Sequence, residues 1–231
     1  MRRFLLLFFS IFILISSCNP KLSTGLRKKD LTKDVEMITD KGTMIIRLSD
    51  STPLHRDNFL KLAKKGFFDS VIFHRVIKDF MIQAGDPTSK HAKAGVQLGE
   101  ADAGYTIPAE FHSTLLHYKG VIAAARTGDD VNPKKASSGS QFYIVEGKKY
   151  SDQKLDTIEI RMHKKFLPEQ REAYKTIGGT PWLDGNYTVF GEIVRGLSVI
   201  DSIAVVQTDS SDRPLTDIRI LKTKLVKRSN K

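Results

Sequence analysis

The sequence predicts a mostly β domain with flanking helices, and three stretches carry this prediction. Residues 35–39 and 43–48 flank a short Asp-Lys-Gly turn. Apolar and polar residues alternate in the second of them, which is typical of a β-hairpin with one buried face. Residues 71–82 indicate a strand, a turn and a second strand, and residues 218–226 are expected to form the last strand.

The elements that follow the hairpin are indicated by their end signals. Pro53 in a first turn and Gly66 at the far end enclose an apolar stripe, which predicts a helix. Residues 90–104 are rich in Gly, Ala and Lys and are expected to form a surface loop. Residues 120–126 then read as a strand of small residues, a composition that lets a ligand backbone approach closely or simply fits a crowded wall.

Two further helices are expected between residues 147 and 179. Ser151 is a cap residue for the first of them, in which apolar residues recur at helical spacing. Pro168 opens the second, and a Gly-Gly pair ends it. A short helix at 197–203 precedes the last strand.

The N-terminal residues predict the subcellular localisation of the protein. Arg2 and Arg3 precede an apolar run at 4–15 that is too short for a comfortable membrane span, so residues 1–17 are predicted to be a secretory signal peptide. The run ends in Ile-Ser-Ser-Cys, which resembles a bacterial lipobox, and Cys18 is therefore the expected site of lipidation. A signal peptide cut elsewhere, with a chance cysteine, is the alternative.

Residues 18–34 are polar, basic and without apolar periodicity, so they are expected to form a lipid-anchored flexible tether. The residues after Cys18 are not acidic. By the sorting rules of bacterial lipoproteins, this favours a place in the cell envelope on the outer membrane, facing the periplasm. Because Cys18 is the only cysteine, an intrachain disulfide is excluded.

The chain is basic, with a net charge of +11, or +9 without Arg2 and Arg3. Such a charge is one sign of anionic partners. The lysines are scattered, however, and no nucleic-acid module is recognisable, so a solvated basic surface and no nucleic-acid partner are expected. A basic envelope protein that binds an anionic polymer, with a steep salt dependence, stays open as a weaker alternative.

One stretch combines apolar residues with a guanidinium and an amide at short range, which is the composition of a lined cleft. It is FHRVIKDFMIQAGDP at 73–87. Taken alone, the stretch also fits an ordinary strand, turn and strand of the core. Together with the later blocks at 138–144 and 182–191, it resembles the cyclophilin family of peptidyl-prolyl cis-trans isomerases.

This resemblance implies a fold and a domain organisation. The fold is a closed antiparallel β-barrel with flanking helices, in which the last strand seals the barrel and removes exposed edges. The isomerase domain is expected at 35–228. Within it, residues 147–179 depart from a minimal cyclophilin and are interpreted as a helical insertion, which is either a basic arm on the rim or a guide for clients.

The resemblance also implies roles for single residues. Arg75 and Gln83 are the implied catalytic residues, and Gln141 is expected to orient Arg75. The side chains implied to bind substrate are Phe80, Met81, Ala125, Gln141, Tyr143, Trp182, Leu183 and Tyr187. Tyr143 stands where the family usually has phenylalanine, so its hydroxyl must find a partner. Tyr187 stands where animal cyclophilins have histidine, for which an altered client preference is expected.

Rotation about an Xaa-Pro bond makes and breaks no covalent bond, so the implied activity needs neither a nucleophile nor a metal, and no cofactor is expected. The implied partners are proline-containing unfolded or flexible protein segments, with cyclosporin as an inhibitor and the membrane as an anchor. A monomer is expected. The alternative function is a barrel that binds proline segments as a chaperone without turnover, and the presence of Arg75 favours the enzyme.

Overall fold

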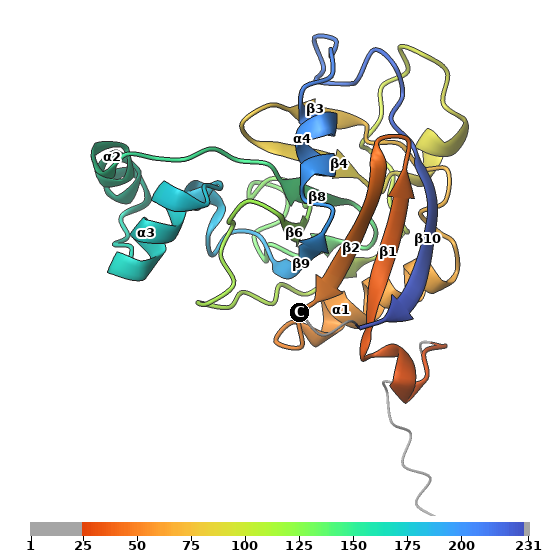
Figure 1. Ribbon diagram of the computed structural model, residues 1–231, viewed down its shortest axis with the longest axis horizontal. Coiled ribbons are helices and arrows are strands. Elements are labelled where there is room, and N and C mark those ends of the chain that lie inside the picture. Colours follow the sequence, from red (N-terminus) through yellow and green to blue (C-terminus); the bar gives the residue numbers. More distant parts are fainter. Residues whose placement is uncertain (1–24, 229–231) are drawn as a thin grey trace, which may run out of the picture.

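The computed structural model describes residues 25–228, so the predicted signal peptide (1–17) and Cys18 lie outside the described residues. One antiparallel sheet dominates the fold, with the strand order β10-β1-β2-β9-β6-β8-β4-β3 (Figure 1). Its strands are β1 (Lys33–Thr39), β2 (Gly42–Leu48), β3 (Arg75–Ile77), β4 (Met81–Ala84), β6 (Val121–Ala124), β8 (Phe142–Val145), β9 (Val189–Arg195) and β10 (Ile220–Lys227). A separate small sheet pairs β5 (Thr106–Ile107) with β7 (Ser137–Ser138).

The hairpin of β1 and β2 has the register that the alternating pattern predicts. Val35 pairs with Ile46 and Met37 pairs with Met44. All four side chains are buried, because residues two apart on a strand point to the same face. The prediction of a mostly β domain is confirmed.

The sheet is curled, but it is not closed. The prediction that the last strand closes the barrel is therefore wrong. β3 and β10 are the two edges of the sheet. The residues just before β3 reach the start of β10, where the Ser70 amide donates to the Ile220 carbonyl (2.7 Å) and the Phe73 amide donates to the Ile218 carbonyl (2.9 Å). Once β3 begins, the Val76 amide donates instead to the carbonyl of Asp212 (2.8 Å), in a loop. β3 itself therefore forms no ladder with β10, and the sheet stays open between these two strands.

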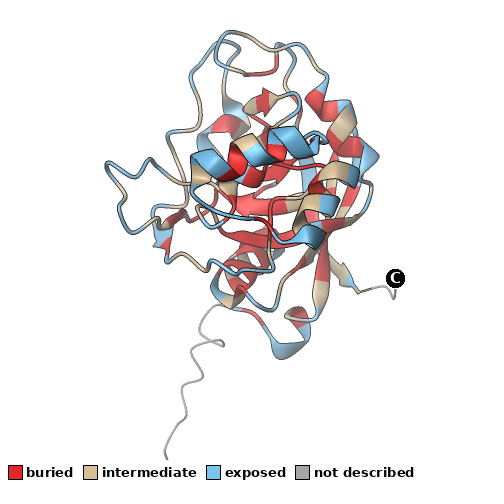
Figure 2. Cartoon of the chain, turned by 90° about the vertical axis from the view of Figure 1, so that its left-hand side faces the viewer, coloured by how far each residue is buried: buried red, intermediate tan, exposed pale blue. Residues whose placement is uncertain are grey.

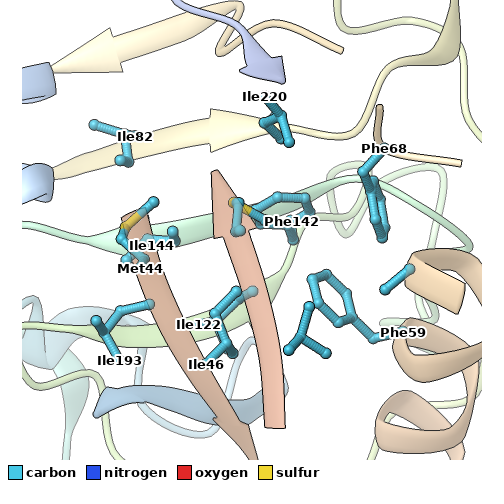
Figure 3. Close-up of a cluster of buried hydrophobic side chains, with 14 of the residues drawn as sticks. Met44, Ile46, Phe59, Phe68, Ile82, Ile122, Phe142, Ile144, Ile193 and Ile220 are labelled. Carbon is cyan, nitrogen blue, oxygen red and sulfur yellow. The ribbon is translucent and has the colours of Figure 1, made fainter. Parts of the chain in front are cut away.

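Helices complete the hydrophobic core on the inside of this sheet. α1 (Pro53–Lys64) contacts β9 and β10, and α4 (Ser198–Ala204) contacts β2, β3 and β4. Figure 3 shows Phe59 of α1 and Phe68 beside aliphatic side chains from several strands. The ring centroids of these two residues are 4.9 Å apart. Two short 3-10 helices, η3 (Pro87–His91) and η4 (Pro181–Leu183), lie in the connections.

Leu26, Asp30 and Asp34 are buried against the domain, whereas the sequence predicts a flexible tether as far as residue 34. Leu26 is 3% exposed and belongs to the main core. After it comes the short 3-10 helix η2 (Lys28–Asp30). The Asp30 carboxylate accepts hydrogen bonds from the Arg27 amide (3.0 Å) and the Lys64 ammonium (2.9 Å), which lower the pKa of Asp30 to about 2. The packed domain thus includes residues that precede the first strand.

The helices predicted between residues 147 and 179 are present, and we call this segment the helical arm. It contains α2 (Asp152–Met162) and α3 (Pro168–Thr176), which lie on the side of the molecule away from β1, β2 and β10 (Figure 1). Ser151 caps α2 as predicted, because its side chain accepts from the Lys154 amide. The arm has its own small core, formed by Leu116, Tyr150, Leu155, Ile158, Phe166 and Tyr174.

The outer sides of the arm helices are exposed, while the strands behind them are largely buried (Figure 2). None of the helices within residues 25–228 has the length and apolar character needed to cross a membrane.

Candidate active site

A cleft of about 290 Å³ lies beside strands β3, β4, β6 and β8. Most of the residues that the sequence predicts for the site line this cleft, namely Arg75, Phe80, Met81, Gln83, Ala125, Tyr143, Leu183 and Tyr187. Sequence reasoning missed the other lining residues, which are His74, Leu98, Gly99, Arg126 and Ser211. His74 directly precedes Arg75, and Arg126 directly follows Ala125. Their place next to predicted site residues could therefore have identified them. Leu98, Gly99 and Ser211 come from loops that carry no local pattern for a site.

The register of the strands explains why these side chains share one face. Gln83 of β4 pairs with Arg75 of β3 on one side and with Tyr143 of β8 on the other. Side chains alternate along a strand, so Met81 and Gln83 both line the cleft, whereas Ile82 between them belongs to the main core. Rigid neighbouring strands thus hold the guanidinium, the amide and the aromatic ring at fixed separations.

The Arg75 side chain is 42% exposed, and its Nε lies 3.3 Å from Asp212 Oδ2. Gln141, which the sequence predicts to orient Arg75, is bonded instead to Gln83. Gln83 Nε2 donates to Gln141 Oε1 (3.0 Å), and Gln141 Nε2 donates to the Gly99 carbonyl (2.7 Å). Gln141 is therefore absent from the lining of this cleft; it lines an adjacent hollow of about 170 Å³ together with Gln83, and it fixes Gln83. With its N–H directed at Gln141, Gln83 offers its carbonyl oxygen to a ligand.

The inner part of the cleft is an apolar hollow. Met81 and Tyr143 are buried there, and Phe80, Ala125 and Leu183 are partly buried against the same cluster. Apolar walls with a few polar groups at the rim are the usual composition of a site that holds a small apolar ring. The side chain of a proline residue has this character.

Two predicted aromatic residues extend this surface in different ways. Trp182 stands beside the cleft rather than in its lining, 38% exposed, with its ring centroid 5.8 Å from that of Phe80. Tyr187 lies in the lining and makes a T-shaped ring contact with Tyr143, with 5.9 Å between the ring centroids. The Arg126 guanidinium covers the Tyr187 ring at 4.5 Å from its centroid. This cation–π contact fixes the ring that stands where animal cyclophilins have histidine.

Burial keeps two titratable groups of the cleft lining, His74 and Tyr143, uncharged near neutral pH. Burial lowers the pKa of His74 to about 4, and within residues 25–228 neither of its ring nitrogens has a hydrogen-bond partner. Burial raises the pKa of Tyr143 well above its ordinary value. Its hydroxyl lies 2.9 Å from His117 Nε2, which supplies the partner that a buried phenol requires. In this part of the chain, no group of three or more His, Cys, Asp or Glu side chains could hold a metal ion.

Comparisons with known proteins agree with this geometry. The family described as "Cyclophilin type peptidyl-prolyl cis-trans isomerase/CLD" matches residues 34–225. The "Peptidyl-prolyl cis-trans isomerase ppi1" of Schizosaccharomyces pombe is 36% identical over 82% of this chain and 96% of that protein. A protein of Staphylococcus epidermidis is 35% identical over 87% of this chain and 94% of its own length.

A solved structure is also similar. It is a cyclophilin type peptidyl-prolyl cis-trans isomerase of Cryptosporidium parvum in the presence of the dipeptide Ala-Pro, with a TM-score of 0.60 and 26% identity, covering 85% of this chain and 99% of that one. The family match spans most of the domain, and the cleft unites eight of the ten side chains that the resemblance to this family implies. This chain therefore belongs to the cyclophilin family and is a peptidyl-prolyl cis-trans isomerase.

Proposed function

We propose that this isomerase accelerates rotation about Xaa-Pro bonds in proteins of the bacterial cell envelope and so assists their folding. A lipid on Cys18 would hold the domain at the outer membrane, facing the periplasm. The observation that supports this localisation is the sequence before Cys18. It combines a charged start, a short apolar run and small residues at the expected cleavage point. Several acyl chains would be needed for a stable anchor, because a single chain binds only marginally.

We propose Arg75 as the catalytic residue of this reaction, and the observation that carries this proposal is its place at the rim of the apolar hollow. Rotation about the amide has a barrier of roughly 18–20 kcal/mol because it breaks resonance. In the twisted state the proline nitrogen regains a lone pair, which a guanidinium N–H can meet with a hydrogen bond. The cleft thereby stabilises the twisted amide more than either planar form.

The remaining predicted residues have supporting roles in this proposal. Phe80, Met81, Tyr143 and Leu183 hold the proline ring, while Gln83 and Ala125 contact the backbone of the client. Gln141 acts through Gln83, to which it is bonded. Trp182 and Tyr187 flank the hollow and select among clients, and Trp182 also offers an indole N–H to a cyclosporin carbonyl. The Cryptosporidium structure with Ala-Pro supports a proline-containing peptide as the ligand class.

The activity is tested with the purified chain lacking residues 1–17, by measuring isomerisation of a short Xaa-Pro peptide with NMR exchange spectroscopy. Turnover that depends on Arg75 is the expected result. Binding of proline peptides without any turnover would replace the enzyme with the binding-module interpretation. A monomer is expected in the same preparation by light scattering.

The anchor is tested separately in cells. Cys18→Ser should move the domain from the membrane fraction to the soluble envelope fraction, because the thiol that carries the lipid is gone. Mass spectrometry of the wild type should find the lipid on the residue that follows the cleaved signal peptide. Identical fractionation of both proteins, with no lipid detected, would show that the anchor is wrong and leave the catalytic proposal untouched.

A further inference from the structure

A continuous chain of hydrogen bonds leads from the floor of the hollow to the helical arm. The Tyr143 hydroxyl lies 2.9 Å from His117 Nε2, and His117 Nδ1 lies 2.9 Å from Asp184 Oδ1. The other oxygen of that carboxylate, Oδ2, lies 2.6 Å from the hydroxyl of Tyr174 in α3. All four residues are buried. We call them the relay.

The direction of each bond in the relay follows from its chemistry. A carboxylate only accepts, so Asp184 receives the Tyr174 O–H and the His117 Nδ1–H, and it also accepts the His117 amide (2.8 Å). His117 Nε2 is then left to accept from the Tyr143 O–H. Burial and the charge of Asp184 raise the pKa of Tyr174, which keeps its hydroxyl protonated as a donor. Each side-chain polar atom of the relay thus has a partner.

The near end of the relay touches the part of the site that recognises substrate. Tyr143 lines the cleft, and its ring stacks on that of His117 with 6.1 Å between centroids. Asp184 directly follows Leu183 in the sequence, and Leu183 also lines the cleft. Trp182, which precedes Leu183, stands beside the cleft. One buried carboxylate therefore secures both the floor and one wall of the hollow.

The far end of the relay belongs to the arm and does not line the cleft. Tyr174 is fully buried in the small core of the arm, where its ring lies 5.6 Å from that of Phe166 and 4.8 Å from that of Tyr118. Its carbonyl accepts from the Tyr150 amide (3.1 Å). α3 is thus joined to Asp184 by a short hydrogen bond between buried groups.

We propose that His117, Asp184 and Tyr174 are positioning residues of the isomerase, and that through them the helical arm sets the fit of the proline ring against Tyr143. The inference rests on the assignment of the hollow to the proline ring made above. It gives the arm a role in client selection that a merely basic arm on the rim would not have.

The relay is tested by a double-mutant cycle in the full chain, with kcat and KM measured on a series of Xaa-Pro peptides. Tyr174→Phe removes one hydroxyl and leaves a buried carboxylate oxygen of Asp184 without its donor. KM should rise about 3–10-fold, with kcat within about twofold because Arg75 is untouched. In a Tyr143→Phe background the relay is already cut, so adding Tyr174→Phe should change KM by less than about 1.5-fold.

Tyr150→Phe is the matched control. Tyr150 lies in the same small core, but within residues 25–228 its hydroxyl has no hydrogen-bond partner. Its removal therefore deletes the same group from the arm without touching the relay, and KM should stay at the wild-type value. Equal effects of Tyr150→Phe and Tyr174→Phe, or a Tyr174→Phe effect of the same size in both backgrounds, would overturn the proposal in favour of a purely structural arm.

A second measurement decides the case in which Tyr174→Phe does not fold. Tyr143→Phe tests the relay from the near end, because it leaves His117 Nε2 buried without a donor, and it should raise KM by a similar factor. An unchanged KM for this variant overturns the relay. Arg75→Ala tests separately whether the cleft is the active site. If activity depends on Arg75 but the KM effects of Tyr143→Phe and Tyr174→Phe are additive, only the relay is rejected.

Discussion

Replacing Arg75 by alanine tests the catalytic assignment, and the structure separates its effect on rate from its effect on stability. The ion pair of Arg75 with Asp212 joins side chains that are 42% and 41% exposed. Exposed pairs of this kind contribute about 0–1 kcal/mol. A loss of about 1 kcal/mol lowers the Tm of a domain of this size by about 2–4 °C, so Arg75→Ala should fold.

The expected effect on the rate is much larger. A preorganised donor aimed at the charge of a transition state contributes about 10²–10³ in rate, or about 2.7–4 kcal/mol. Arg75→Ala should therefore lower kcat/KM by two to three orders of magnitude, measured by NMR exchange on an Xaa-Pro peptide with folding checked by circular dichroism. Arg75→Lys should rescue poorly, because an ammonium lacks the planar fork of donors.

Asp212→Asn is the matched control for this experiment. It removes the same ion pair but keeps the guanidinium, and asparagine tolerates the positive φ of 62° that Asp212 adopts. The rate should stay within a few-fold of the wild type, since an exposed pair is worth at most about 1 kcal/mol. A folded Arg75→Ala protein with near wild-type turnover would refute the mechanism. An equal loss in Asp212→Asn would assign the effect to the loop that carries Asp212.

Two further predictions concern the edge and the lining of the cleft. Trp182→Phe keeps the apolar area but removes the indole donor, so inhibition by cyclosporin should weaken far more than turnover slows; equal losses, or no inhibition of the wild type, would contradict the proposed pocket. His74 has a pKa of about 4 when folded against an ordinary value of 6.5, so the unfolded chain binds more protons between these values. The contribution of His74 to the free energy of unfolding should be fully present above pH 6.5 and fall by up to roughly 3 kcal/mol toward pH 4, as measured by urea unfolding. His74→Leu should flatten this slope, and an unchanged slope would contradict the assignment.

Local patterns accounted for the elements of the fold. The alternation at 43–48 predicts one buried face for the hairpin, and Met44, Ile46 and Leu48 are all buried. The cap at Ser151 likewise predicts the start of α2. These signals depend only on residues a few positions apart, so they can be interpreted without knowledge of the tertiary structure.

Contacts between distant segments were beyond such reasoning. Arg75 meets Asp212 across 137 positions of sequence, and no local pattern marks that aspartate as a partner. Leu26 is one of only three leucines in the polar segment 18–34, too few for a periodic apolar pattern that would predict its burial in the core. Closure of the barrel depended in the same way on whether β3 and β10 meet, which is a property of the curvature of the whole sheet and not of either strand.

Tyr143 shows why the site needed both kinds of inference. The resemblance to the family marks this position as the floor of the hollow, and the chemistry of a buried phenol requires a partner. Neither identifies His117, which is 26 positions away and is brought behind the floor by the segment leading into β6. A catalyst that forms no covalent bond depends on fit. A hydroxyl added to the pocket floor must therefore be satisfied from behind, and in this chain the partners extend to Tyr174 in the arm. Two of the three departures from the usual family pattern, the phenol in the hollow and the helical arm, are thus joined by one set of hydrogen bonds. A relative with phenylalanine at this position has no such bond to lose.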